Sequence, residues 1–174
     1  MDADVFTTIE RFLERGGPVL LAIGVTTFLL WAAIVERFIY FNFVHKKLCQ
    51  DAIDQWRARK DHTSWAAHKI RAKLISDVRL EAQAGLIIIS GLVALCPLLG
   101  LLGTVTGMVE VFDVMALTGS SNPRAMASGV SRSTIPTMSG MVAALSGLYF
   151  RVSLSKKAEQ EVKHLADQLE IEHA

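Results

Sequence analysis

The sequence lacks the residue patterns that mark a catalytic, metal or nucleic-acid site. It holds only two cysteines, Cys49 and Cys96, with no CxxC or Cys/His spacing, so neither a disulfide framework nor a zinc site is predicted. It has no GxSxG or HExxH motif, and its five histidines are spaced too irregularly for a metal set. No long basic stripe with interleaved aromatic residues occurs, and the net charge is only +1. We therefore expect no enzyme, no cofactor, no metal and no nucleic-acid partner.

The amino terminus lacks the basic start and the small-residue cleavage site of a signal peptide, so we expect it to remain in the mature protein. Residues 1–17 instead place apolar side chains on one helical face, which is typical of a short amphipathic helix at a membrane surface, here the periplasmic one. Gly16 and Gly17 are expected to break this helix, because glycine is a poor helix former.

Long apolar segments dominate what the sequence does contain. The 174 residues are 51% hydrophobic and 20% charged, with a mean hydropathy of +0.36, which is typical of a membrane protein with a water-facing part. Residues 18–43 are long enough, at about 1.5 Å per residue, to cross a hydrocarbon core of about 30 Å. Residues 84–114 and 127–150 are the second and third predicted transmembrane helices. The predicted fold class is an all-α membrane protein with three transmembrane helices and cytoplasmic helical extensions.

Basic residues indicate which ends of these helices face the cytoplasm. Residues 44–83 hold nine Lys or Arg against five Asp or Glu, and this positive excess assigns the segment to the cytoplasm. The amino terminus is then periplasmic, residues 115–126 form a periplasmic loop, and 151–174 form a cytoplasmic helix. Ser64 is a candidate cap for a helix that runs unbroken into the second transmembrane helix. The four-three-four apolar spacing in 151–174 is typical of a helix that bundles with others of its kind.

Two stripes of small residues predict where helices pack closely. Small side chains let two helix backbones approach, which is how transmembrane helices associate when water supplies no driving force between them. A proline in each helix removes one backbone hydrogen bond and is expected to bend it. The second helix carries Gly100, Gly103 and Gly107 with Pro97, and the third carries Ser133, Thr137, Gly140, Ala144 and Gly147 with Pro136.

Charged residues lie toward the external ends of the second and third helices. Glu110 and Arg132 are each eleven residues from Ser121 in the loop, so an antiparallel helix pair would hold them at similar depth. We predict an intramembrane ion pair, which would lower the free-energy cost of burying either charge. The pair is interpreted either as a gate or filter at the outer mouth of a pore, or as a structural clamp. For Glu110 and Asp113, a position at the water boundary also remains open.

Each of the three predicted transmembrane helices contains one segment that resembles a known family motif, and the three segments occur in the family's order. They are WAAIVERF in the first, LLGLLGTVTGM in the second and GVSRSTIPTMSGMVAALSG in the third. The last two resemble the paired signatures of the ExbB, TolQ and MotA family of bacterial inner-membrane motor subunits, and the first is similar to the end of that family's first helix. Within the family, the resemblance is nearest to ExbB of the TonB system.

This resemblance implies an oligomeric helical bundle around a central pore, namely a homopentamer that encloses an ExbD-like dimer in the inner membrane of a Gram-negative bacterium. Proton flow past an aspartate of that partner would drive a TonB-like protein, and so the outer-membrane uptake of iron complexes or similar cargo. Whether a second ExbB-like paralogue takes part is left open. The family's pore-facing threonines fall on Thr104 and Thr137, and Ser133 is a further candidate for the proton path.

Arg132 departs from the family pattern, because ExbB and TolQ usually carry a glutamate at this place. A glutamate can hold or pass a proton near neutral pH, whereas an arginine is effectively always charged. Two functions are therefore weighed against each other. One is a proton-conducting stator whose titrating carboxylate comes from the partner, and the other is a non-conducting scaffold that clamps partner helices.

Overall fold

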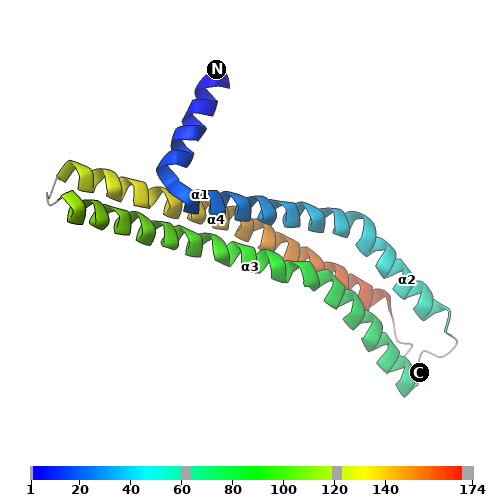
Figure 1. Cartoon of the computed structure of the whole chain (residues 1–174). Coiled ribbons are helices and arrows are strands. Elements are labelled where there is room, and N and C mark those ends of the chain that lie inside the picture. Colours follow the sequence, from blue (N-terminus) through cyan, green and yellow to red (C-terminus); the bar gives the residue numbers. More distant parts are fainter. Residues whose placement is uncertain (1, 60–63, 119–122, 170–174) are drawn as a thin grey trace. The chain divides into compact units, whose positions relative to one another are not determined.

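The described chain is helical throughout, apart from short connections (Figure 1). The structure is a computed structural model that describes residues 2–59, 64–118 and 123–169, with the backbone alone for 2–16, 118, 123–125, 128, 131 and 132. No strand occurs within these ranges, which confirms the all-α class. The elements are α1 (Asp2–Ile39), the π-helix η1 (Tyr40–Val44), α2 (His45–Arg57), α3 (Trp65–Thr118) and α4 (Pro123–Gln168).

Helix α1 is interrupted at the glycine pair that precedes the first predicted transmembrane helix. Gly17 has φ 64° and ψ −167°, a backbone conformation that residues with a Cβ atom rarely adopt. Pro18 follows at once, and its fixed φ suits the first turn of a new helix. The break therefore lies where Gly16 and Gly17 predict it.

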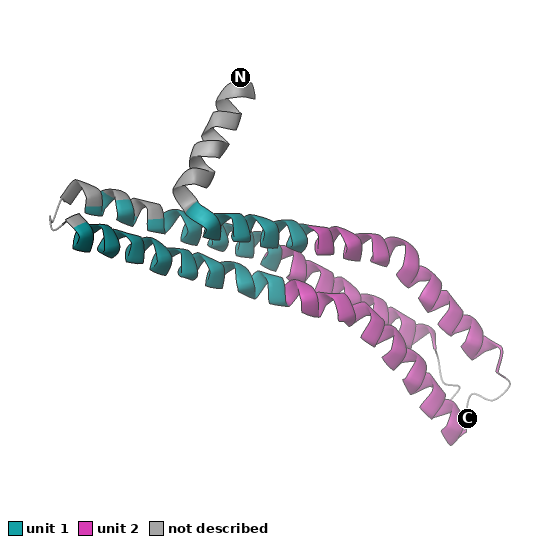
Figure 2. Cartoon of the chain, in the orientation of Figure 1, with its two compact units in different colours: residues 1–31, 91–148 teal, residues 32–90, 149–174 magenta. Residues whose placement is uncertain are grey.

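The chain divides into two compact units, each formed by parts of the same long helices (Figure 2). Unit 1 contains Met1–Trp31 and Gly91–Leu148, and unit 2 contains Ala32–Ser90 and Tyr149–Ala174. Within unit 1, parts of α1, α3 and α4 lie side by side, and α2 joins the corresponding parts of these helices in unit 2. Unit 1 holds most of the second and third predicted transmembrane helices, and unit 2 holds the segment assigned to the cytoplasm.

Unit 1 leaves much of its apolar surface uncovered. The side chains of Phe28, Leu98 and Val142 are 73%, 61% and 68% exposed, respectively. An apolar surface of this extent is suited to lipid or to other helices. By length and composition, two helical stretches, Gly17–Arg57 and Trp65–Leu117, are able to cross a membrane. The third predicted transmembrane helix, 127–150, lies in α4, which is rich in glycine, serine and threonine, and its membrane crossing stays a prediction.

The helices extend further at their ends than the apolar segments do. Ser64 Oγ accepts a hydrogen bond of 3.2 Å from the backbone N–H of Ala67, so the predicted cap at the start of α3 is confirmed. At its other end α3 continues to Thr118, and α4 begins at Pro123. The predicted loop 115–126 is therefore too long by a few residues on each side. Backbone hydrogen bonds and a proline in the first turn set these helix ends, not the end of the apolar run.

The core of unit 2 is filled by the apolar stripe of α4. Ala158, Val162, Leu165 and Leu169 are all at most 5% exposed. Residues buried on the other helices of this unit include Trp56 of α2 and Val78 and Ala82 of α3. The apolar stripe of α4 therefore packs against helices of the same chain.

Arg71 of α3 stabilises the carboxyl end of α4. Its Nε donates a hydrogen bond of 2.6 Å to the carbonyl oxygen of Leu169, and its Nη2 donates one of 2.7 Å to that of Ala166. The last carbonyls of a helix have no partner within the helix and carry partial negative charge, so a guanidinium suits them. Two long helices are joined here at their ends.

Replacing Arg71 by methionine should loosen the end of α4. Because two charge-assisted hydrogen bonds at a half-buried site are lost, we expect a destabilisation of about 2 kcal/mol. Hydrogen–deuterium exchange of the backbone amides in 160–169 should become faster in the purified full-length chain. Arg79→Met, at an exposed position on the same helix, is the control, and an equal effect of both changes would contradict this role of Arg71.

Candidate functional site between α3 and α4

The two predicted stripes of small residues pack against each other inside unit 1. A Cβ atom added to Gly107 would lie 2.8 Å from Ser133 Cβ, and one added to Gly100 would lie 3.0 Å from Thr137 Cα. One added to Gly103 would overlap the ring of Pro136. As the residue number rises along α3, the residue it contacts on α4 has a lower number, so the two helices are antiparallel. Almost no space remains between their backbones.

The rest of the third-helix stripe extends this contact. A Cβ atom on Gly140 would meet the carbonyl oxygen of Cys96 at 2.5 Å, and one on Gly147 would meet Leu30 at 2.6 Å and Val93 at 2.7 Å. Ala144 is 8% exposed. The stripe thus packs mainly on α3 and, at Gly147, also on α1.

The two prolines lie within continuous helices. Helix α3 runs through Pro97, and α4 runs through Pro136. The ring of Pro136 is fully buried and fills the space that Gly103 leaves open. Pro136 therefore acts as a rigid packing group, and the predicted bends at the two prolines stay a prediction.

The three candidate pore hydroxyls make different hydrogen bonds. Thr137 Oγ1 donates across the interface to the carbonyl oxygen of Gly100 at 2.8 Å. Thr104 Oγ1 donates within its own helix to Leu101 O at 2.7 Å, and Ser133 Oγ donates to Val130 O at 2.9 Å. Ser133 is buried in the helix contact, at 3% exposure, whereas Thr104 is half-exposed. Thr137 joins two helices, whereas the Thr104 hydroxyl bonds within α3, and both side chains are partly exposed.

The predicted charge pair, Glu110 and Arg132, belongs to the parts of α3 and α4 next to the Gly107–Ser133 contact. The side chains of Glu110 and Asp113 are exposed; the Arg132 side chain lies outside the described residues, so the pair stays a prediction. A Cβ atom on Gly103 would lie 3.3 Å from Val19, which is at the start of the first predicted transmembrane helix. Glu110 is seven residues further along α3, a rise of about 10 Å. This level favours the interpretation that the acidic residues are near the external water boundary.

A second cluster, in unit 2, was not singled out from the sequence. The Arg37 guanidinium lies over Gly85, in the space that a side chain there would fill. Its Nη1 donates to Glu81 O at 3.4 Å, and its Nε lies 3.2 Å from a Glu36 carboxylate oxygen. The guanidinium carbon is also 4.9 Å from the centre of the Tyr40 ring. The adjacent charges of Glu36 and Arg37 are the sequence signal, but nothing in the sequence points to the glycine.

An arginine of α4 makes an equivalent contact with α3. Arg151 Nε donates to Ser90 Oγ at 2.9 Å, and Ser90 Oγ donates to Leu86 O at 2.7 Å. Within unit 2, Arg37 of α1 and Arg151 of α4 thus both contact α3. Guanidinium groups can keep their charge while bonded to helix backbone and hydroxyl oxygens, which suits a boundary between lipid and water.

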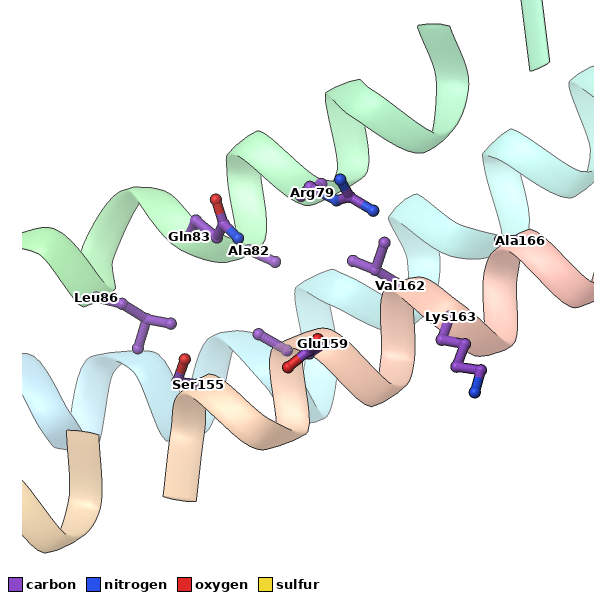
Figure 3. Close-up of a pocket in the computed structure, with 10 residues that line it drawn as sticks. Arg79, Ala82, Gln83, Leu86, Ser155, Glu159, Val162, Lys163 and Ala166 are labelled. Atoms are coloured by element: carbon purple, nitrogen blue, oxygen red, sulfur yellow. The ribbon is translucent and has the colours of Figure 1, made fainter. Parts of the chain in front are cut away.

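Two cavities adjoin these helices. One, of about 510 Å³, lies between α3 and α4 in unit 2, with Arg79, Gln83 and Glu159 on its walls (Figure 3). The other, of about 760 Å³, is an apolar groove between α1 and α4 in unit 1. The hydroxyls that line this groove donate to carbonyls of their own helices. Within the described residues, no cluster of three potential metal ligands is found.

These features define a class: an all-helical membrane protein in which the long helices α3 and α4 form a tight antiparallel pair. A model of the MotA/TolQ/ExbB proton channel family matches residues 32–167, more than half of the chain. The chain belongs to this family, which confirms the resemblance noted in its sequence.

Individual relatives carry the same family name. The chain is 41% identical over 73 residues to the putative biopolymer transport protein ExbB-like 1 of Synechocystis sp., covering 40% of this chain and 29% of that protein. It is 22% identical over 170 residues to the putative biopolymer transport protein ExbB-like 1 of Helicobacter pylori strain J99, covering 88% and 90%. It is 33% identical over 92 residues to the biopolymer transport protein exbB1 of Vibrio cholerae, covering 52% and 40%. The matches thus span less than half of the Synechocystis and Vibrio proteins.

The close α3–α4 contact can be tested with two glycines of one helix. Gly103→Ala should force α3 away from the rigid Pro136 ring and destabilise unit 1 by about 1–3 kcal/mol, as expected for overpacking. Gly91→Ala is the matched control, because an added Cβ there meets nothing within 4 Å. Thermal unfolding of the full-length chain in detergent should show a lower midpoint for Gly103→Ala alone. Equal midpoints would mean that the helices are not packed at Gly103.

Proposed function

We propose that this chain is the oligomeric subunit of a stator driven by the proton-motive force, and that it does not act as an enzyme. In this proposal five copies surround an ExbD-like dimer in the inner membrane, and proton flow energises a TonB-like protein for outer-membrane uptake of iron complexes or similar cargo. Membership of a proton channel family supports the conduction step. One charge that crosses 100 mV releases about 2.3 kcal/mol, which is enough in principle to bias a helix movement.

The observation that carries this proposal is the contrast between the hydrogen bonds of Thr104 and Thr137. Both side chains are partly exposed and both hydroxyls lie near the Gly103–Pro136 contact, but that of Thr137 donates to Gly100 O of the other helix at 2.8 Å. The Thr104 hydroxyl donates within its own helix, to Leu101 O. A hydroxyl can both donate and accept a hydrogen bond, so it can support a water chain or a transiently neutral acid of the partner. We assign the pore-facing role to Thr104 and the helix-joining role to Thr137.

The packing also supports assembly with other chains. The small-residue stripes pack against each other within unit 1. Large side chains such as Leu101 and Leu145, by contrast, are 59% and 65% exposed. In a bilayer, these faces are available to lipid, to further copies and to the partner's helices. Neither a pentamer nor a partner dimer follows from one chain, and both rest on the family resemblance.

A non-conducting scaffold is the second candidate, and Arg132 favours it. An arginine cannot give up its proton, so it cannot relay one. In a conducting complex, the titrating carboxylate must then come from the partner. Glu110 and Arg132 would act together as a fixed pair that sets the local potential and the spacing of the helices.

Valine substitutions should separate the two threonine roles. Thr104→Val should leave stability unchanged and lower proton flux about tenfold. The reason is that the substitution removes a hydrogen bond to the moving proton's carrier, which raises the free-energy barrier to proton transfer by about 1–1.5 kcal/mol. Thr137→Val should lower stability by about 1 kcal/mol, because it removes an interhelical bond. Flux is measured with a pH-sensitive dye in vesicles that contain the chain and its partner, and unfolding is measured in detergent. Unchanged flux in Thr104→Val would reject the pore role, and no flux in the wild-type complex would favour the scaffold.

The proposed topology places residues 115–126 in the periplasm and 44–83 in the cytoplasm. In a chain whose native cysteines are replaced by alanine, Ser120→Cys should react with an impermeant thiol reagent added outside intact spheroplasts. Ser76→Cys, at an exposed position of α3, should react only after the membrane is opened. The opposite pattern would invert the whole assignment.

A further inference from the structure

A buried histidine lies where the first long helix continues into α2. His45 is the first residue of α2 and directly follows the π-helix Tyr40–Val44, whose wide turn it closes with a backbone bond to Tyr40 O. A single π-helical turn within a longer helix is uncommon and frequently marks a functional position. The His45 side chain is 0% exposed.

The surroundings of His45 accommodate a neutral ring. The centre of its imidazole lies 5.3 Å from that of the Phe41 ring and 6.0 Å from that of the Tyr40 ring. Its Nε2 lies 3.5 Å from Cys49 Sγ. Its Nδ1 is buried and has no hydrogen-bond partner among the described residues. One nitrogen is thus engaged by a weakly polar thiol, and the other has no acceptor.

Two charged residues of α4 influence the charge state of this ring. Glu161 favours the charged form of His45, whereas Lys157 opposes it. The Lys157 ammonium is 5.9 Å from the centre of the Phe41 ring and 5.5 Å from that of Phe38. On its own helix, Cys49 is the titratable group in contact with His45, and burial raises the pKa of its thiol, with Glu161 adding to the effect. The charge state of this buried ring at the start of α2 is therefore coupled to an acidic and a basic residue of α4.

Protonation changes what this site can hold. In the imidazolium both nitrogens are donors, whereas the neutral ring has one donor and one acceptor. The charged ring therefore needs an acceptor at Nδ1, which the described residues do not supply, and it excludes the tautomer in which Nε2 accepts a hydrogen bond from the Cys49 thiol. Burial disfavours the charged ring, and Glu161 offsets this cost only in part. We infer that His45 is a proton-sensing latch, which holds α2 against α4 while it is neutral and releases α2 when it binds a proton. The inference does not require that the chain conducts protons.

The direction of the pH dependence follows from the burial. Desolvation, the largest effect, lowers the pKa of His45 from its ordinary value of 6.5. At a pH above 6.5 the ring is neutral in both the closed and the released state, and the latch is fully effective. As the pH falls below 6.5, the released state binds the proton first, so closure weakens progressively toward the lower pKa of the closed state. Acid at the cytoplasmic surface would thus loosen unit 2.

Hydrogen–deuterium exchange of residues 45–57 in the full-length chain tests the latch. After correction for the intrinsic exchange rate, exchange should be slow at pH 7.5 and rise several-fold by pH 5.5. Because a single proton is bound, its slope should not exceed about tenfold per pH unit. His45→Phe, which keeps an aromatic ring but cannot titrate, should abolish the rise. His68→Gln, at an exposed position, should retain it.

Two charge variants test the latch without changing His45. Lys157→Met keeps an apolar stem over the phenylalanine rings and removes a positive charge, so the midpoint of the exchange curve should move to higher pH. Glu161→Gln removes the negative charge that favours the imidazolium, so the midpoint should move to lower pH. Opposite shifts support the latch even if His45→Phe does not fold. Shifts in one direction, no shifts, or a pH response that persists in His45→Phe would overturn it.

Discussion

The closeness of α3 and α4 is the constraint on which unit 1 depends. In lipid, two helices gain little by excluding apolar surface from each other, so they associate through dense contacts and interhelical hydrogen bonds. Glycines on α3 bring the Thr137 backbone close enough for its hydroxyl to reach Gly100 O. The Pro136 ring then occupies the groove at Gly103 without adding conformational freedom. Each feature requires the small residue opposite it.

This contact also decides which surfaces remain for other chains. The small residues that could have joined separate chains are already packed within one chain. What unit 1 presents is large apolar side chains, the half-exposed Thr104 and, further out, the exposed Glu110 and Asp113. In the proposed complex, the large apolar faces are available for association, and these few polar groups are available to a partner or a pore.

Unit 2 is stabilised by different physics, although the same helices form it. Water surrounds this part in the proposed topology, so apolar burial supplies a driving force, and the fully buried Leu165 and Leu169 belong to an ordinary core. Arginines direct the helix contacts: Arg37 lies over Gly85, and Arg71 binds the end of α4. His45 differs from these arginines: it is a fully buried polar ring beside aromatic side chains, and its Nδ1 has no hydrogen-bond partner among the described residues. A group of this kind favours one state of its surroundings only while it remains neutral.

The amino-acid sequence by itself determined the helical class, the break at Gly17, the cap at Ser64 and the small-residue stripes. Each of these follows from local periodicity or from the backbone preference of one residue, and the family signatures are local as well. Only the tertiary structure decided which side chains meet. Thr137 and Gly100 are 37 residues apart, and Arg71 and Leu169 are 98 apart. Such partners depend on how each helix is rotated about its axis and on the register between helices. Neither quantity is contained in the spacing of residues along a single helix.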